Sequence, residues 1–290
     1  MKVSGFTFLR NGEKFGYPFV ESIKSVLPIV DEFVVALGPC EDRTEAMIRG
    51  INDPKIRVIP TAWNERIRND LRLKGFIYGQ QKSIALFNCT GDWAFYLEAD
   101  ELVHEAELDR IRQSMEQHLD NPAVEALVFD YLHFYGNPNT YAWSPRWYRT
   151  APRIVRNTIP IWGPKGLFFI VMENHKRGRY PRAARAGATV YHYGWVRSGE
   201  QMNAKSRAAA RFWNNKASSV DYPEIDPRTL KRFVGTHPRV IQDWLPAADG
   251  LFQANPNHRL TARERKHRLM MKLERWFGLE LSKKHYRLVA

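Results

Sequence analysis

An apolar run that stops at a cluster of carboxylates constrains this sequence more than any other feature. Residues 93–97 read Trp-Ala-Phe-Tyr-Leu and follow the turn pair Gly91-Asp92. The run is too short for a helix and rich in aromatic residues, which predicts a strand buried on both faces. Glu98, Asp100 and Glu101 follow it directly. Because ligands of open α/β sheets bind beyond the carboxyl ends of the strands, we expect a ligand site at these carboxylates.

The rest of the N-terminal half alternates between strand and helix patterns. Apolar runs predict strands at 3–9, 33–37 and 56–59, and a further strand at 126–129. Between them, apolar residues recur at helical spacing in 17–27, 42–48 and 78–87, and Asp42 is placed to cap the second of these helices. This alternation predicts an α/β fold with a mostly parallel, doubly wound central sheet.

Composition narrows the class of protein. A chain of 290 residues with 44% hydrophobic content can bury a substantial core. Its two cysteines make no disulfide framework, and no apolar stretch reaches the roughly 18 residues of a membrane span. No signal peptide is recognisable either, so we expect a cytoplasmic protein that is soluble or peripheral. The net charge of +13 favours anionic partners: nucleic acid, an acidic membrane surface or phosphorylated substrates.

Glu98 and Asp100 have the chemistry of a divalent-cation site. One small residue separates the two carboxylates at the predicted strand end. Mg²⁺ and Mn²⁺ prefer oxygen ligands and accept phosphate oxygens in their shell, so a metal bound here could also hold a phosphorylated ligand. The alternative on local sequence alone is a solvated acidic turn.

Several motifs occur in an order that resembles the family 2 glycosyltransferases. They are Arg10-Asn11-Gly12-Glu13 after the first strand, Asp42-Arg43-Thr44 after the second, the segment 81–86, and residues 91–101. The resemblance covers roughly residues 1–200 and is strongest to the branch found in bacterial lipopolysaccharide, capsule and exopolysaccharide synthesis. It implies a GT-A nucleotide-sugar-binding fold (Rossmann-like), a divalent metal (Mn²⁺ or Mg²⁺) and inverting transfer of a sugar, expected to be a hexose, from a nucleoside-diphosphate donor. Residues 201–290 would then form a mainly helical C-terminal extension.

The resemblance also assigns roles to particular residues. Glu98 and Asp100 stand at the family's Asp-x-Asp metal motif, and His192 matches a late histidine that ligates the same metal. The donor-binding residues implied are Arg10, Asn11, Asp42, Lys82, Glu98, Asp100 and Arg197, with Lys205 beside Arg197. Leu37 stands where many members have an aspartate that contacts the nucleobase, so the base is not predicted. The bland alternatives are a packed histidine at 192 and solvated side chains at 82, 197 and 205.

An inverting transfer needs a general base, and two carboxylates are candidates. Glu173 follows the apolar run 167–172, so it is predicted to lie at a strand end. Asp130 lies within the apolar run 126–131, where burial would raise its pKa. We prefer Glu173. Either residue could instead be a fold-supporting carboxylate paired with an arginine.

Arginines and aromatic residues are interleaved between residues 146 and 156. Such a segment can line a sugar and phosphate groove, or its arginines can simply pack on aromatic rings at the surface. Arg153 and Arg156 are three residues apart, so an extended chain would place them on opposite faces. We therefore do not assign both to one ligand.

The C-terminal segment is strongly basic. Residues 261–286 show apolar residues at helical spacing, and 261–290 contain nine Lys or Arg against three Glu. A basic amphipathic helix with Trp and Phe on one face is typical of a peripheral anchor on an anionic membrane, here the inner face. A helix docked on the catalytic domain with a solvated basic face is the equal alternative.

Three functional classes compete at this stage. The favoured one is a metal-dependent glycosyltransferase that uses a nucleotide-sugar donor and a glycan or lipid-linked acceptor in cell-surface polysaccharide synthesis. A sugar-phosphate nucleotidyltransferase would need a Gly-rich phosphate loop after the first strand, and residues 8–12 are not one. A basic nucleic-acid-binding protein fits the charge, but the sequence has no helix-turn-helix, zinc or RNA-binding motif, so no nucleic acid is expected.

Overall fold

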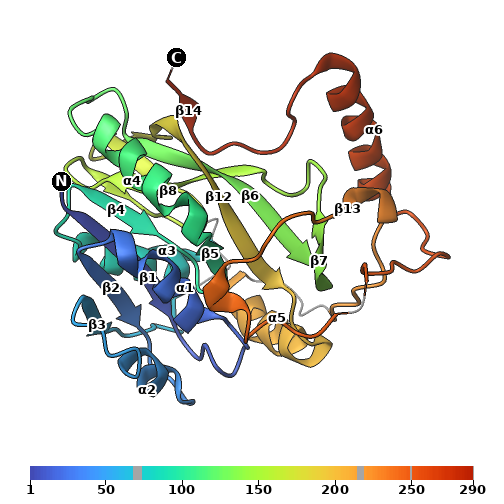
Figure 1. Cartoon of the computed structure of the whole chain (residues 1–290), viewed down its shortest axis with the longest axis horizontal. Coiled ribbons are helices and arrows are strands. Elements are labelled where there is room, and N and C mark those ends of the chain that lie inside the picture. The colour runs from blue at the N-terminus through green and yellow to red at the C-terminus, as the bar shows by residue number, and fades with distance from the viewer. Residues whose placement is uncertain (68–73, 214–218, 249, 290) are drawn as a thin grey trace.

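The computed structural model describes residues 1–67, 74–213, 219–248 and 250–289, and its centre is one large sheet (Figure 1). The N-terminal half of the sheet is parallel, with strands in the order β3-β2-β1-β4. These strands are β1 (Val3–Leu9), β2 (Glu32–Leu37), β3 (Ile56–Pro60) and β4 (Trp93–Tyr96). The helices between them are α1 (Phe19–Val26) with a short 3₁₀ turn η1 (Leu27–Ile29), α2 (Thr44–Arg49) and α3 (Phe76–Phe87). The predicted α/β class and strand–helix order are confirmed.

The C-terminal half continues the sheet with mixed directions. Strand β8 (Thr150–Arg156) pairs antiparallel with both β4 and β6 (Ala126–Tyr135), and β12 (Arg182–Trp195) runs parallel to β6. The other strands at this end are β5 (Glu101–Val103) and β7 (Asn137–Ala142). A 3₁₀ turn η2 (Glu105–Glu107) leads into helix α4 (Leu108–Gln117). A separate small sheet contains β9 (Ile161–Trp162), β10 (Ile170–Asn174) and β11 (Arg177–Arg179).

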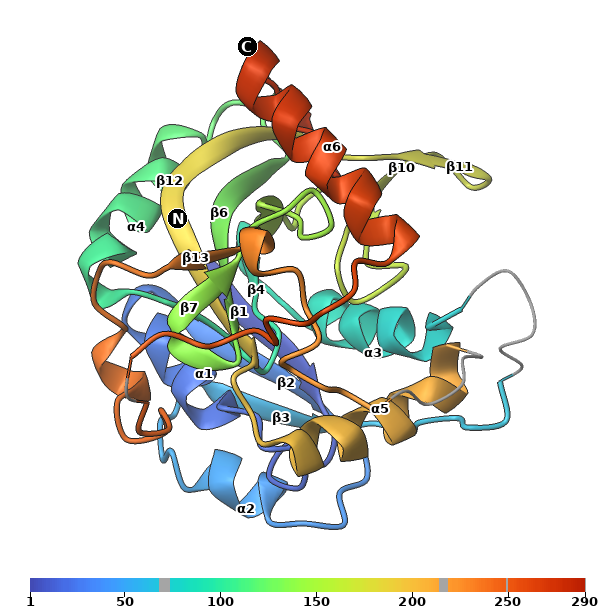
Figure 2. The ribbon, with the colours of Figure 1, turned by 90° about the vertical axis from the view of Figure 1, so that its right-hand side faces the viewer.

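The apolar strands are buried on both faces, as their unbroken hydrophobicity predicts. Alternate residues such as Val35 and Phe95 belong to a cluster that contains side chains of α1 and α4. Their neighbours Val34 and Tyr96 belong to a second cluster that contains side chains of α3. Figure 2 shows α3 on one side of the parallel strands and α1 with α4 on the other. Because side chains alternate along a strand, this two-sided core requires a run with no polar positions.

The segment after residue 198 contains two long helices. Helix α5 spans Gly199–Trp213. Helix α6 spans Ala262–Phe277 and is shorter than the predicted 261–286. A capping box between Thr261 and Glu264 starts it, and Gly278, with φ +64°, ends it.

Part of the C-terminal segment joins the central sheet. Strand β13 (Leu230–Arg232) pairs with β7, and β14 (Arg287–Leu288) pairs with β12. Short 3₁₀ turns lie at η3 (Pro227–Thr229) and η4 (Arg239–Ile241). The domain boundary at residue 200 stays a prediction. Across the described ranges, none of the helices has both the length and the apolar character needed to cross a membrane.

Candidate active site

A cavity of about 610 Å³ opens at the carboxyl ends of β1 and β4. Leu9, Arg10 and Asn11 contribute to it from the end of β1, and Glu98 and Asp100 from the end of β4. Aromatic side chains form much of the remaining wall, among them Phe8, Tyr17, Trp63, Tyr78, Tyr148, Phe168 and Phe212. The cavity therefore lies where the sequence predicted a ligand site.

Asp100 is a buried carboxylate surrounded by cations. Its Oδ2 accepts a hydrogen bond from Nη2 of Arg197 and lies 3.3 Å from Nζ of Lys205. Burial by itself would raise the pKa of Asp100, but Lys205, Arg197 and His192 outweigh burial and hold that pKa well below its usual value. Asp100 is therefore ionised at neutral pH. The Arg197 guanidinium also lies over the ring of Tyr17, 4.0 Å from its centroid.

Asp100 also faces His192, which β12 brings to the end of β4. Nε2 of His192 lies 3.6 Å from Oδ1 of Asp100. Gly194 keeps the adjacent space open, because a Cβ at this position would lie 2.5 Å from Nε2 of His192 and 3.1 Å from Oδ2 of Asp100. The two groups thus share a small space that any side chain at residue 194 would fill.

A second histidine determines which nitrogen of His192 carries its proton. Nε2 of His133 lies 2.7 Å from the carbonyl oxygen of Tyr148, and a carbonyl can only accept, so this nitrogen carries hydrogen. Burial, aided by His192, lowers the pKa of His133 well below its ordinary value, so its Nδ1 is an acceptor. Nδ1 of His192 lies 2.9 Å from that acceptor and must donate to it. Burial also lowers the pKa of His192, which leaves its Nε2 with a lone pair directed at Asp100.

The other two carboxylates of the cluster have different environments. Glu98 lines the cavity, and burial, reinforced by the charge of Glu101, raises its pKa to about 7 although Arg153 opposes the shift. Glu101 lies deeper, fully buried, and binds the Arg153 guanidinium at 2.8 and 2.6 Å while accepting from the Tyr131 hydroxyl at 3.0 Å. Glu101 and Arg153 form an internal ion pair, whereas Glu98 and Asp100 line the cavity.

Glu98, Asp100 and His192 fit a divalent cation by their donor types. Two carboxylates and one imidazole lone pair suit Mn²⁺, which accepts nitrogen as well as oxygen ligands. Within the described ranges, no three carboxylate, imidazole or thiol groups converge closely enough to form a ready-made metal cage. The facing pair Asp100 and His192 therefore supplies the core of a possible site, and water or phosphate oxygens would have to complete the shell.

Lys82 is a buried residue that contacts the cavity wall. Its side chain is fully enclosed, and Nζ donates to the carbonyl oxygens of Gly166 at 2.7 Å and Phe168 at 3.3 Å. The ammonium also sits 3.5 Å from the centroid of the Phe169 ring. Lys82 thus holds the cavity wall at 166–168, and its burial excludes the alternative of a solvated helix face, whereas its donor-binding role stays a prediction.

Of the other predicted donor residues, Arg10 and Asn11 line the cavity and Asp42 does not. Arg10 donates to the carbonyl oxygen of Pro39 and pairs with Glu65. Asp42 instead accepts from the backbone N–H groups of Lys14 at 2.8 Å and Thr44 at 3.1 Å. These bonds tie the turn before α2 to the loop after β1, so Asp42 supports the fold here, and its donor-binding role stays a prediction.

Neither predicted general base lines the cavity. Glu173 lies on β10 of the small sheet and pairs with Arg177 at 3.2 Å and Arg179 at 3.3 Å. Asp130 is exposed on β6 and faces Arg185 at 3.4 Å. Both are arginine-paired carboxylates outside the cavity, which was the bland alternative for each. The structure does not bring either residue into the lining that contains Asp100, and the general base stays a prediction.

The arginines of β8 lie on opposite faces, as predicted. Arg153 points inward to Glu101 and to the carbonyl oxygen of Leu167. Arg156 points to the end of α4, where it donates to the carbonyl oxygens of His118 and Leu119. Neither is among the residues that line the cavity. Both arginines therefore stabilise the framework.

Sequence reasoning missed the aromatic end of the cavity. The Trp63 ring packs edge-on against Tyr78 and Phe212, with centroids 5.7 and 5.8 Å apart, and Arg10 lies over it at 5.6 Å. A Cβ on Gly38 would lie 2.4 Å from Nε1 of Trp63, so the indole covers the end of β2 beyond Leu37. Three segments far apart in sequence build this wall, and no local pattern indicates it.

Comparisons with known proteins give a partial structural match. No family model matches the sequence, and no curated protein matches it significantly. Among solved structures, the glucosyl-3-phosphoglycerate synthase of Mycobacterium tuberculosis, in complex with Mn²⁺, UDP and phosphoglyceric acid, matches with 18% identity and a TM-score of 0.32, over 46% of this chain and 43% of that one. TarS of S. aureus matches with 14% identity and a TM-score of 0.35, over 54% of this chain and 28% of that one.

Both likenesses have TM-scores below 0.5 and concern the fold alone. The matched region spans less than half of each of the two proteins, and the likeness concerns part of the fold. A shorter form of TarS, residues 1–349, matches similarly, with 16% identity and a TM-score of 0.35. Donor, metal and acceptor for the present chain have to be argued from its own residues.

Proposed function

We propose that this protein is a metal-dependent glycosyltransferase that uses a nucleoside-diphosphate sugar. The observation that carries the proposal is the contact between Asp100 and His192. A carboxylate and an imidazole lone pair face each other at 3.6 Å, in the space beside Gly194 at the carboxyl end of β4. Two electron-rich groups at this distance repel each other unless a cation lies between them, and with Glu98 nearby the donor set suits Mn²⁺.

The cavity has parts that match the parts of a nucleotide-sugar donor. The aromatic end formed by Trp63, Tyr78 and Phe212 offers faces for a nucleobase and ribose. Arg10 and Lys205 also line the cavity and supply positive charge for a diphosphate. When bound, the metal would neutralise charge on the leaving nucleoside diphosphate. Lys205 stands beside Asp100 and would stabilise the same developing charge as a fixed cation.

Arg197 has a different part in this proposal. Its side chain is fully buried and its guanidinium is bound to Asp100, so it holds that carboxylate in place. With Arg197 beneath Asp100 and Lys205 beside it, the carboxylate stays ionised and oriented toward His192. This is a positioning role, and it replaces the direct contact with the donor that the family resemblance implies for Arg197.

For the acceptor, we keep the expectation of a glycan or lipid-linked molecule in cell-surface polysaccharide synthesis, with inversion at the anomeric carbon. Glu173 and Asp130 are not part of this proposal, because both lie outside the cavity. Determining the anomeric configuration of the product by NMR tests the inversion, since an inverting enzyme converts an α-linked donor into a β-linked product.

We also propose that the protein works at the surface of an anionic membrane, with α6 in contact. The acidic residues of α6 are engaged internally: Glu274 binds Arg149 at 2.8 Å, and Glu264 accepts from its own capping residue Thr261. Trp276 and Phe277 are 64% and 67% exposed. Exposed cations of the same helix accompany them, namely Arg263, Arg265, Lys266, Lys272 and Arg275. An apolar strip between cations is the pattern of a helix that lies in a membrane interface.

Thermal unfolding with a panel of nucleoside diphosphates and nucleotide sugars, each with and without Mn²⁺, tests the transferase. A ligand that binds only the native state raises the unfolding midpoint. We expect a Mn²⁺-dependent rise with one nucleobase, lost in Glu98→Gln and kept in the control Glu173→Gln. If no nucleotide raises the midpoint with or without Mn²⁺, the proposed function is wrong.

A further inference from the structure

Basic side chains outnumber acidic ones in the described lining of the cavity. Glu98 and Asp100 are the acidic residues among its described lining. The cations of the same lining are Arg10, Arg146, Lys165, Lys205 and Lys283. Arg10 pairs with Glu65 and Lys205 with Asp100, so carboxylates of the protein already balance part of this charge. Arg146, Lys165 and Lys283 add further positive charge to the lining, and such a lining attracts anions.

Some of these basic side chains belong to a part of the cavity wall that lies far in sequence from the predicted donor residues. Lys283 and His285 come from the segment between α6 and β14, and Lys165 precedes the wall that Lys82 fastens. The His285 ring stacks on Phe168, with centroids 4.9 Å apart and planes inclined by 11°. Lys165, Lys283 and His285 therefore line the same part of the cavity wall.

The surroundings of His285 hold its ring in a fixed orientation. His285 is buried, and its Nδ1 lies 3.2 Å from the Tyr180 hydroxyl, which fixes the ring. Its other nitrogen, Nε2, has no hydrogen-bond partner among the described residues and belongs to a side chain that lines the cavity. Burial and then the charges of Lys283, Arg153 and Lys165 lower the pKa of His285 to about 4.

The same wall reaches the carboxylates. A Cβ on Gly166 would lie 3.6 Å from Oε1 of Glu98, so the residue after Lys165 is in contact with the predicted metal site. A molecule held at Lys165, Lys283 and His285 would therefore lie beside the point where a donor sugar is transferred. The position is that of an acceptor.

We propose that the acceptor carries a phosphate group, bound by Lys283, Lys165 and His285. This inference rests on the proposed glycosyltransferase function and names the chemistry of its second substrate. The phosphate can belong to a lipid headgroup or to a free molecule, and both present the same anion to the wall. The two lysines bind it as point charges, and Nε2 of His285 marks the position of its nearest oxygen.

The test uses the full-length protein saturated with Mn²⁺ and the nucleoside diphosphate found by the panel, so that the donor end is filled. Inorganic phosphate is then titrated against the unfolding midpoint at constant ionic strength. We expect phosphate to raise the unfolding midpoint of the wild type. It should leave the midpoints of Lys283→Met and Lys165→Met unchanged. The matched control is Lys284→Met, because Lys284 pairs with Glu280 at 3.2 Å and does not line the cavity.

Two results overturn the proposal. One is a phosphate-induced rise of equal size in wild type, Lys283→Met and Lys165→Met; the other is no rise in the wild type while nucleotide plus Mn²⁺ still stabilises it. The second result leaves the transferase proposal standing, so the two failures are distinguishable. Sedimentation with phosphatidic acid vesicles, compared with phosphatidylcholine, identifies the source of the phosphate. Binding that Lys283→Met loses and Lys284→Met keeps indicates a lipid headgroup; binding unaffected by either indicates a free phosphorylated acceptor.

Discussion

The Nδ1 atoms of His133 and His192 lie 2.9 Å apart, and the Tyr148 carbonyl on the far side of His133 decides which of them donates. His133 thereby directs the lone pair of His192 toward Asp100. Outer partners of this kind fix the orientation of a metal-binding histidine and typically change metal affinity by about 10- to 100-fold when removed.

His133→Phe should therefore weaken Mn²⁺ binding by about 10- to 100-fold. His133→Gln should restore most of it, because the Gln amide can donate to the Tyr148 carbonyl and accept from His192. Isothermal titration with Mn²⁺ measures both variants. Equal affinity in wild type and His133→Phe would contradict the positioning role.

Asp100→Ala should destabilise the fold as well as the site. Removing this carboxylate leaves the buried Arg197 guanidinium without its counter-ion, which typically costs about 3–5 kcal/mol of unfolding free energy. The double variant Asp100→Ala/Arg197→Met should recover most of the loss. Urea unfolding measures it; the proposal of a charge-coupled pair fails if the single variant is as stable as the wild type.

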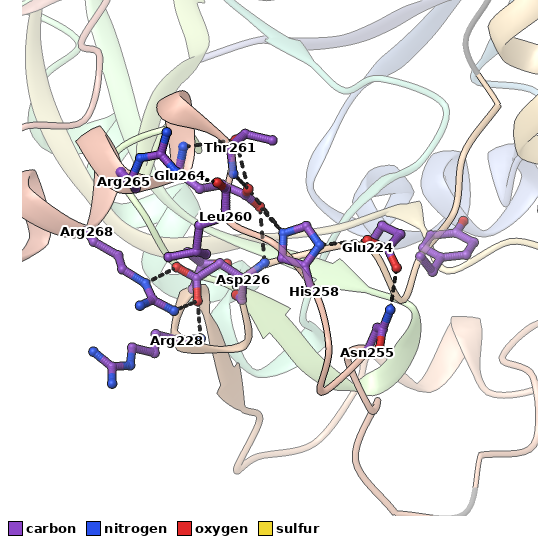
Figure 3. A network of polar contacts seen from close by, with 12 residues as sticks. Glu224, Asp226, Arg228, Asn255, His258, Leu260, Thr261, Glu264, Arg265 and Arg268 are labelled. Carbon is purple, nitrogen blue, oxygen red and sulfur yellow. Dashed lines mark hydrogen bonds and ion pairs between the residues drawn. The ribbon is translucent and has the colours of Figure 1, made fainter.

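The base of α6 should loosen as pH rises. His258 bridges Glu224 at 2.7 Å and Glu264 at 3.1 Å (Figure 3), and the hydrogen bond to Glu224, more than that to Glu264, raises the pKa of His258. A raised folded pKa means that this stabilisation is fully present below the unfolded value of about 6.5 and is lost as pH rises through the folded value.

Hydrogen exchange of the α6 amides as a function of pH measures this loosening. We expect protection to fall, relative to the rest of the chain, as pH rises above about 6.5 in the wild type. His258→Gln should show weaker protection with no such pH dependence. The Asp226–Arg268 pair in the same network does not titrate in this range and keeps α6 docked in both proteins.

Membrane binding should depend on the exposed C-terminal end of α6. Trp276→Ser with Phe277→Ser should reduce sedimentation with vesicles containing anionic lipid by about tenfold or more, because each aromatic side chain contributes about 1.5–3 kcal/mol when buried. Leu251→Ser, at an exposed apolar residue outside α6, is the control. Binding should also fall with added salt. An unchanged bound fraction in the double variant would exclude α6 as the contact.

The strand–helix alternation of the first half and the position of the cavity were predictable from the sequence, because both follow from local patterns. Asp100 and His192 face each other, with Glu98 in the lining of the same cavity, because strand ends meet at one edge of the sheet. How deeply each carboxylate is buried was not predictable. Glu101 and Glu98 look alike in the sequence, but Glu101 is held inside the protein by the distant residues Arg153 and Tyr131.

Lys82 and Glu173 show the limits of pattern and resemblance. A lysine on a helix before the opening strand looks like a ligand or a solvated residue, and its burial depends on residues 163–169, some 80 positions later. Glu173 does follow an apolar run, but that run forms a strand of the separate small sheet. A strand end locates a ligand site only when the strand belongs to the sheet that forms the cavity.

The close contact between α3 and the turn at 163–164 restricts how this protein can diverge. A Cβ on Gly163 would lie 2.7 Å from Cδ of Lys82, and a Cβ on Gly79 would lie 2.2 Å from the carbonyl oxygen of Pro164. A side chain at position 163 fits only if residue 82 becomes shorter. At position 79 no compensating substitution is available, because the atom that a side chain would meet belongs to the backbone. Homologues should therefore vary positions 82 and 163 together and keep position 79 unchanged.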